Sequence, residues 1–175
     1  MTHFGDRLTE ANRRTATPLC MGIDPHASMI PAIFGDAQDG AASDAAIRAI
    51  NDFSMACLEQ AIGHVAAIKP QAAFFEQQGP AGMQILQNLG RAAIDAGLLV
   101  IMDAKRGDIG STSTAYAAGW IGHDAPFPSD ALTVNPWLGI DTLAPFLDRA
   151  DATGSGLFIL NRTSNPGAGD LQDQL

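Results

Sequence analysis

The segment VIMDAKRGDIG, residues 100–110, carries the side chains best suited to chemistry. Four charged residues follow directly on an apolar run: Asp103, Lys105, Arg106 and Asp108. In a strand, residues two apart lie on one face, so we expect Asp103 and Lys105 to point the same way. Carboxylates on both sides of a lysine favour its charged form, which makes it a poor Schiff-base nucleophile but a good cation and proton donor. A structural ion-pair network that ends the strand is the alternative interpretation.

Polar residues also end the other apolar runs that the sequence predicts as strands. The runs are 19–24, 65–69, 98–103, 131–135 and 157–161, and they end at Asp24, Lys69, Asp103, Asn135 and Asn161. Proline follows three of these residues, and because it cannot donate to a neighbouring strand it marks where a strand stops. The carboxyl ends of parallel strands meet at one rim, so we expect a shared site there. For the two asparagines, a strand that simply leaves the core is an equally good interpretation.

Segments with helical spacing separate the predicted strands. Helices are expected over residues 4–14, from Ser43 or Asp44 to Ile62, from Met83 to Ile94, from Ser111 onward, and from Ile140 to Arg149. Continuous apolar strands that alternate with helices predict an α/β fold with a parallel sheet covered on both faces.

The composition limits the kinds of function. A formal net charge of −9 argues against nucleic acid or an anionic membrane surface as a partner, but allows an anionic small molecule where Lys and Arg gather locally. No apolar run reaches membrane-spanning length and the start lacks a signal-peptide core, so a cytoplasmic protein is predicted. Cys20 and Cys57 lack metal or redox spacing and are expected in the core. The four histidines form no ligand pattern.

The segment DAKRGDI, residues 103–109, resembles the DxKxxDI signature of the orotidine 5′-phosphate decarboxylase suprafamily, and most closely its longer bacterial decarboxylases. The resemblance extends through GIDP at 22–25, AIKPQAAFFE at 67–76, VIMDAKRGDIGST at 100–112, TVNPWLG at 133–139 and LNRTSNPGAG at 160–169. It implies a TIM (β/α)8 barrel, of which residues 1–175 would be a single domain with about the first five βα units. Magnesium-dependent relatives that act on sugar phosphates usually carry an acidic residue after the second strand, so Lys69 favours the nucleotide decarboxylase.

The resemblance implies that orotidine 5′-phosphate is converted to uridine 5′-phosphate, a step of pyrimidine biosynthesis, without a metal or cofactor. It gives Lys105 the ammonium that stabilises the C6 carbanion and then protonates it, and it sets Asp103 beside the substrate carboxylate. It also implies a homodimer in which Asp108 reaches the partner's site across the interface. The implied substrate contacts are Asp24 and Lys69 at the ribose hydroxyls, Ile109 and Thr112 near Asp108, and Ser164 at the pyrimidine.

The length of the chain is the main departure from the family. A β/α barrel has eight strands and usually about 250 residues, whereas 175 residues and five readable strands are present. The family's phosphate-binding glutamine and arginine, which follow strands seven and eight, have no counterpart, so we expect the isolated chain to be nearly inactive. An anion could bind the backbone of Gly107–Gly110, but an ordinary turn with Ser111 as the helix cap is the stronger interpretation. A magnesium-dependent sugar-phosphate lyase and a non-catalytic fragment remain alternative hypotheses.

Overall fold

The computed structural model describes residues 2–173, which form an α/β structure around one five-stranded sheet. The strands are β1 (Cys20–Ile23), β2 (Ala67–Pro70), β3 (Leu99–Arg106), β4 (Ala131–Val134) and β5 (Gly156–Ile159). Their spatial order is β1-β2-β3-β4-β5, and every neighbouring pair is parallel. Each strand therefore lies beside the next strand of the chain, which is the order found in a β/α barrel.

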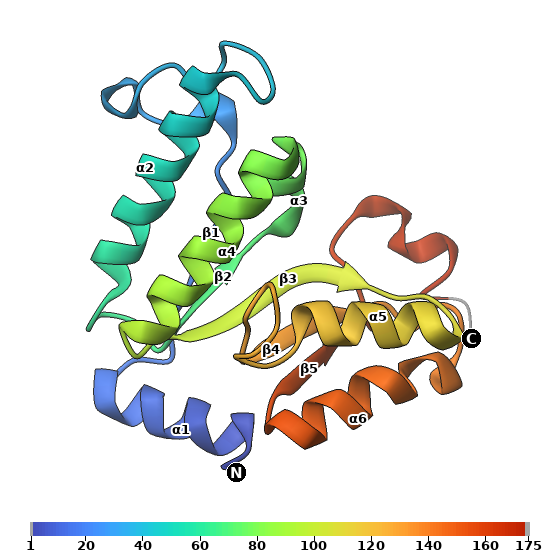
Figure 1. Ribbon diagram of the computed structural model, residues 1–175. Helices are drawn as coiled ribbons and strands as arrows, with labels where there is room; N and C mark the ends of the chain where they lie inside the picture. Colours follow the sequence, from blue (N-terminus) through green and yellow to red (C-terminus); the bar gives the residue numbers. More distant parts are fainter. Residues whose placement is uncertain (1, 174–175) are drawn as a thin grey trace.

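Helices connect each strand to the next one along the chain (Figure 1). The helices are α1 (Phe4–Thr15), α2 (Asp44–Ala61), α3 (Ala72–Glu76), α4 (Gly79–Asp95), α5 (Gly110–Trp120) and α6 (Ala144–Thr153), with 3-10 turns η1 (Ala27–Met29), η2 (Ala32–Phe34), η3 (Ile140–Leu143) and η4 (Pro166–Asp170). The long predicted helices are confirmed, whereas α3 was not predicted because five residues are too few to show a helical period. Within residues 2–173, no helix is long and apolar enough to cross a membrane.

The sequence predicted the N-terminal capping residues of two helices, and one of the two predictions is correct. Ser43 precedes α2 and its side chain accepts a hydrogen bond from the N–H of Ala46, as an N-cap does. The expected Ser111 cap of α5 is wrong, because that helix begins at Gly110 and the residue before it makes no side-chain cap. Ser113 Oγ instead donates to the carbonyl of Asp108, which ties the first turn of α5 to the preceding loop.

The main hydrophobic core lies between the helices and one face of the sheet. Its fully buried side chains include Ile23, Ile68, Val100, Met102 and Leu132 from the strands, together with Ile50, Leu86, Leu89 and Phe146 from the helices. Burial of one such aliphatic side chain stabilises a fold by about 1.5–3 kcal/mol. This layer therefore fixes the positions of the strand ends that carry the charged residues.

Helix α1 covers the start of the other face of the sheet. Arg14 donates to the carbonyl of Gly97 over 2.8 Å and Arg7 donates to that of Gly154 over 3.2 Å, and both carbonyls precede a strand. The smaller apolar cluster beneath α1 consists of Phe4, Ala11, Ala66, Ala67, Leu99, Ile101 and Ala131. Cys20 and Phe158, which lie on the same face, are exposed, so the prediction of a sheet covered on both faces is wrong at these positions.

The positions of the two cysteines follow from this partial cover. Cys20 belongs to β1 and is exposed. It pairs with Ala67 on the face that α1 partly covers, but it is not among the residues packed beneath that helix, so the expectation of a core cysteine is wrong for it. Cys57 on α2 is half-buried against the main core. Phe158 of β5 shows the same effect, since 42 % of it is exposed.

Candidate active site at the carboxyl end of the sheet

The carboxylate of Asp103 is the centre of a hydrogen-bonded cluster at the carboxyl end of the sheet. Lys69 Nζ lies 2.8 Å from Asp103 Oδ2, and Lys105 Nζ lies 2.6 Å from Oδ1. Gln71 Nε2 donates to Oδ2 over 3.1 Å, and Thr133 Oγ1 donates to Oδ1 over 3.0 Å. The four donors come from the end of β2, from β3 and from β4. Three neighbouring strands therefore fix the orientation of one carboxylate.

The electrostatic environment keeps Asp103 ionised although the residue is only 6 % exposed. Burial by itself would raise the pKa of this carboxyl, but hydrogen bonds from Lys105 and Lys69 and their positive charges hold the pKa below its ordinary value. Each lysine thus has a fixed anionic partner. The Lys69 and Lys105 side chains are 35 % and 44 % exposed, so both ammonium groups are accessible to a ligand at the rim.

An irregular stretch of β3 sets the direction of Lys105. The register between β3 and β4 shifts between Met102 and Arg106, so β3 bulges where it carries Asp103 and Lys105. Lys105 has a φ of +49°, a left-handed conformation that is uncommon for a residue with a Cβ. Its N–H donates over 2.8 Å to Thr133 Oγ1, the same hydroxyl that donates to the Asp103 carboxylate. Thr133 therefore links the strained backbone to the cluster.

The residues after Lys105 are directed away from the cluster. Arg106 forms an ion pair with Glu76, and its guanidinium lies 4.6 Å from the centre of the Trp120 ring. Gly107 passes close to β4, where an added Cβ would lie 2.7 Å from the carbonyl oxygen of Asn135. The close approach requires glycine at this position.

The other predicted site residues make no hydrogen bond to the cluster within residues 2–173. The Asp24 side chain is exposed after β1 and has no hydrogen-bond partner within residues 2–173. Asp108 precedes α5, and its Oδ1 accepts the N–H of Ile109 over 2.7 Å. Ile109 is 62 % exposed. The two remaining positions, which are both exposed, are Thr112 and Ser164.

The two asparagines at strand ends do not join the cluster either. Asn135 Oδ1 accepts the backbone N–H of Trp137 over 2.9 Å, which is a local turn after β4. Asn161 is exposed after β5. The predicted convergence of five polar residues therefore holds for Lys69 and Asp103, and at Asn135 the simpler interpretation of a strand end is the correct one.

Gln71 and Thr133 are cluster members that the sequence reasoning missed. A signal for both was present in the spacing, because Gln71 lies two residues after Lys69 and Thr133 lies two residues before Asn135. Residues two apart share a face of a strand, so the rule that linked Asp103 to Lys105 also applies to β2 and β4. The polar side chains at this end of the sheet thus include residues two positions away from the predicted strand ends, as well as the strand-end residues themselves.

The cluster has the properties of a site for an anionic ligand and for proton donation. Two cations on one buried carboxylate leave ammonium protons that can be donated to a ligand. Among residues 2–173, no three His, Cys, Asp or Glu side chains come together in a way that could hold a metal ion.

Comparisons with known proteins agree with this arrangement. The family model described as "Orotidine 5′-phosphate decarboxylase / HUMPS family" matches residues 17–175. The orotidine 5′-phosphate decarboxylase of Rhodopirellula baltica is 44 % identical over 177 residues, and the match covers 99 % of this chain and 59 % of the relative. The decarboxylase of Streptomyces coelicolor is 47 % identical over 172 residues, with 98 % and 59 % covered. The chain thus spans 59 % of the length of these two curated relatives.

Solved structures give the same result. A crystal structure from Streptomyces avermitilis, assigned to the same decarboxylase, has a TM-score of 0.87 and 44 % identity, with 99 % of this chain and 57 % of the other covered. The orotidine monophosphate decarboxylase of Leishmania donovani has a TM-score of 0.73 and 35 % identity, with 98 % and 58 % covered.

Fold and site together define a class of protein. A parallel sheet in sequential order, with alternating helices and a charged cluster at the carboxyl ends of the strands, is the arrangement of the TIM-barrel enzymes, and the described residues supply five strands of it. Within that class, the chain belongs to the orotidine 5′-phosphate decarboxylase / HUMPS family.

Proposed function

We propose that a protein containing this chain decarboxylates orotidine 5′-phosphate to uridine 5′-phosphate in pyrimidine biosynthesis, without a cofactor. The observation that carries the proposal is the Lys105 ammonium, held 2.6 Å from a buried carboxylate at the carboxyl end of the sheet. Relatives at 44 % and 47 % identity bear the name of this decarboxylase, and therefore a magnesium-dependent sugar-phosphate lyase is not favoured. Residues 1–175 would form the amino-terminal part of a single barrel domain in this proposal.

The proposed chemistry follows from where negative charge develops. The bond from C6 of the pyrimidine to its carboxylate breaks, CO2 leaves, and the electron pair stays on C6, where no adjacent carbonyl delocalises it. Lys105 stabilises this charge as a fixed cation and then transfers a proton from Nζ to C6, after which solvent reprotonates the amine. Asp103 holds the ammonium in position for this transfer.

The substrate contacts form a second part of the proposal. Lys69, which shares the Asp103 carboxylate, and Asp24 would bind the ribose hydroxyls, and Ser164 would bind the pyrimidine. All three have exposed or half-exposed side chains, as residues that wait for a ligand require.

A homodimer is also proposed, because the loop that precedes α5 carries a carboxylate and an apolar side chain that could reach a partner subunit. Asp108, which has no ion pair within residues 2–173, would reach the partner's site, with Ile109 and Thr112 beside it. Ile109 is exposed and would add apolar contact area to this interface. A cytoplasmic location belongs to the same proposal, and cell fractionation would test it.

Turnover of a protein with the full length of the relatives tests the proposed role of Lys105. Lys105→Ala should lower kcat by at least on the order of 10²–10⁴-fold, the usual contribution of a proton donor. Arg13→Ala is the matched control, because it removes an exposed cation on α1 whose one ion pair within residues 2–173 is with Glu10. Wild-type turnover in Lys105→Ala would contradict the proposal.

The isolated chain of 175 residues provides a second test. Binding energy from remote parts of a substrate, such as its phosphate, raises kcat as well as affinity. We expect this chain alone to be nearly inactive and to bind uridine 5′-phosphate only weakly in calorimetry. Full turnover by the isolated chain would show that the contacts within it are sufficient.

A further inference from the structure

We propose that a pocket at the amino ends of β4 and β5 binds a small phosphate-bearing ligand. The pocket has a volume of about 620 Å³, and Arg7, His123, Asp124, Arg149 and Ser155 contribute to its wall. A volume of this size is in the range of small-molecule sites. The pocket lies at the opposite end of the strands from Asp103, so it is a different site from the candidate active site.

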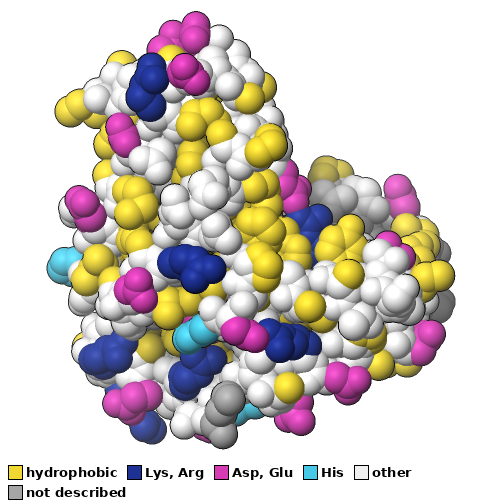
Figure 2. Space-filling view, viewed as in Figure 1, with side chains coloured by type: hydrophobic (Ala, Val, Ile, Leu, Met, Phe, Trp, Pro, Cys, Tyr) yellow, Lys and Arg dark blue, Asp and Glu magenta, His cyan; other side chains and the backbone are white. Residues whose placement is uncertain are grey.

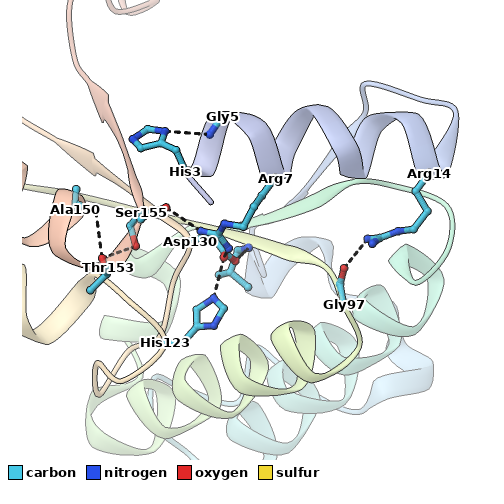
Figure 3. Close-up of polar contacts among 12 residues, drawn as sticks. His3, Gly5, Arg7, Arg14, Gly97, His123, Asp130, Ala150, Thr153 and Ser155 are labelled. Atoms are coloured by element: carbon cyan, nitrogen blue, oxygen red, sulfur yellow. Dashed lines mark hydrogen bonds and ion pairs between the residues drawn. The ribbon is translucent and has the colours of Figure 1, made fainter. Parts of the chain in front are cut away.

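A buried carboxylate organises one side of the pocket. Asp130 is 1 % exposed and directly precedes β4, and it accepts a hydrogen bond from Arg7 (Figure 3). It also accepts one from the backbone N–H of Val100. His123 Nε2 lies 2.8 Å from Asp130 Oδ1. This contact fixes the imidazole and leaves its Nδ1 without a protein partner within residues 2–173. Arg7 also donates to the carbonyl of Gly154, so its guanidinium is held rigidly at the pocket wall.

The other side of the pocket holds a second guanidinium whose partner can be exchanged. Arg149 donates through Nε to the carbonyl of Ile121 over 3.1 Å and through a terminal nitrogen to Asp124. The Asp124 side chain is 70 % exposed, whereas that of Arg149 is 28 % exposed. Exposed ion pairs contribute little net stability. A phosphate group, which accepts two hydrogen bonds from one guanidinium, can therefore take the place of Asp124.

The balance of charge favours an anion once Asp124 turns outward. Arg7 and Arg149 carry two positive charges. Among the five pocket residues given above and Asp130 behind them, Asp130 is then the one carboxylate that still faces these cations. Ser155 adds a hydroxyl, whose oxygen lies 2.8 Å from Thr153 Oγ1. Figure 2 shows basic, acidic and histidine side chains side by side in the lower part of the molecule, in agreement with a polar region at this end. Guanidinium, imidazole and hydroxyl groups from several directions suit a tetrahedral phosphate.

Calorimetric titration with inorganic phosphate, and separately with phenyl phosphate, tests the proposal without any measurement of turnover. Asp124→Asn frees Arg149 and should tighten binding by about tenfold, while Arg149→Gln should weaken it by about tenfold or more. Lys105→Ala is the control at the other end of the sheet and should leave binding unchanged. Because misfolding cannot tighten binding, Asp124→Asn is decisive even if Arg149→Gln fails to fold. Tighter binding of phenyl phosphate identifies a phosphate ester as the ligand, and equal binding identifies free phosphate.

The pKa of Asp124 gives an independent signal. The hydrogen bond from Arg149 lowers the pKa of this exposed carboxyl, so phosphate that displaces it should raise the pKa of Asp124 towards its ordinary value in a carbon-detected NMR titration. The proposal is overturned if Asp124→Asn binds neither phosphate with a Kd of about 10 mM or tighter. It is also overturned if Lys105→Ala abolishes the binding, because the phosphate would then occupy the candidate active site.

Discussion

Replacement of Thr133 by valine removes one hydroxyl from the centre of the candidate active site and little else. Thr133 is 8 % exposed, and valine has nearly the same shape with a methyl group in place of the hydroxyl. The substitution breaks the bond from Oγ1 to Asp103, 3.0 Å long, and the bond from the Lys105 N–H to Oγ1, 2.8 Å long. A partly buried N–H and a buried carboxylate each lose one partner.

The size of the effect follows from the two hydrogen bonds. A bond to a charged acceptor contributes about 1.5–3 kcal/mol and one between neutral groups about 0.5–1.5 kcal/mol. Lys105 is exposed enough for water to reach its N–H, and Asp103 keeps three other donors, so the lower half of the combined range applies. We expect Thr133→Val to lower the free energy of unfolding by about 2–3 kcal/mol.

Urea unfolding of Thr133→Val and Thr133→Ser, compared with the wild type, measures this effect. Serine keeps the hydroxyl and loses one methyl group, which costs about 1 kcal/mol. Hydrogen exchange at the Lys105 amide should accelerate in Thr133→Val and stay slow in Thr133→Ser. The reasoning is refuted if the serine variant is destabilised as much as the valine variant, or if neither variant changes the exchange rate of this amide.

Two further predictions concern the same end of the sheet. The pKa of Asp103 is lowered in the folded protein, so as pH falls this carboxyl is protonated first in the unfolded chain. The ionised Asp103 therefore stabilises the fold above about pH 4, the ordinary pKa of an aspartate. This stabilisation is lost as pH falls through the pKa of the folded state. In Asp103→Asn, the dependence of the unfolding free energy on pH should be weaker between pH 6 and pH 3, and an unchanged dependence would exclude Asp103 as its source. Gly107→Ala should destabilise by about 1–3 kcal/mol because its Cβ would lie 2.7 Å from the Asn135 carbonyl. Gly119→Ala, on α5 with open space around it, should stabilise by about 0.5–1 kcal/mol, and equal thermal shifts for both variants would contradict the packing argument.

Much of the fold could be predicted because each strand is a continuous apolar run. Runs such as LLVIM before Asp103 are typical of strands buried between layers, and together with the intervening helical periods they predicted the parallel order. The predicted cover of the second face failed for a different reason. Whether a sheet face is covered depends on which other element packs on it. The sequence of a strand such as β1, which contains Cys20, is the same whether or not a helix packs on that face.

The cluster around Asp103 could be predicted in part. The shared face of Asp103 and Lys105 was a local property, and the 2.6 Å contact between them confirms it. The bulge that turns Lys105 into a left-handed conformation could not be predicted, because it depends on the register with β4. The hydroxyl of Thr133 belongs to a different strand, and only the paired sheet places it against the Lys105 N–H.

The two buried aspartates of the sheet show how sequence separation limits such reasoning. Asp103 and Asp130 each accept hydrogen bonds from two basic side chains, so they are similar in chemistry. Asp103 lies two residues from Lys105, whereas Asp130 is 123 residues from Arg7, which reaches it from α1. A spacing rule detects the first and cannot detect the second. The partners also differ in exposure: both lysines at Asp103 remain accessible at the rim, while Arg7 is bound on two sides and ties α1 to the sheet. The same kind of charge cluster therefore leaves accessible ammonium groups at one end of the strands and forms a rigid wall at the other.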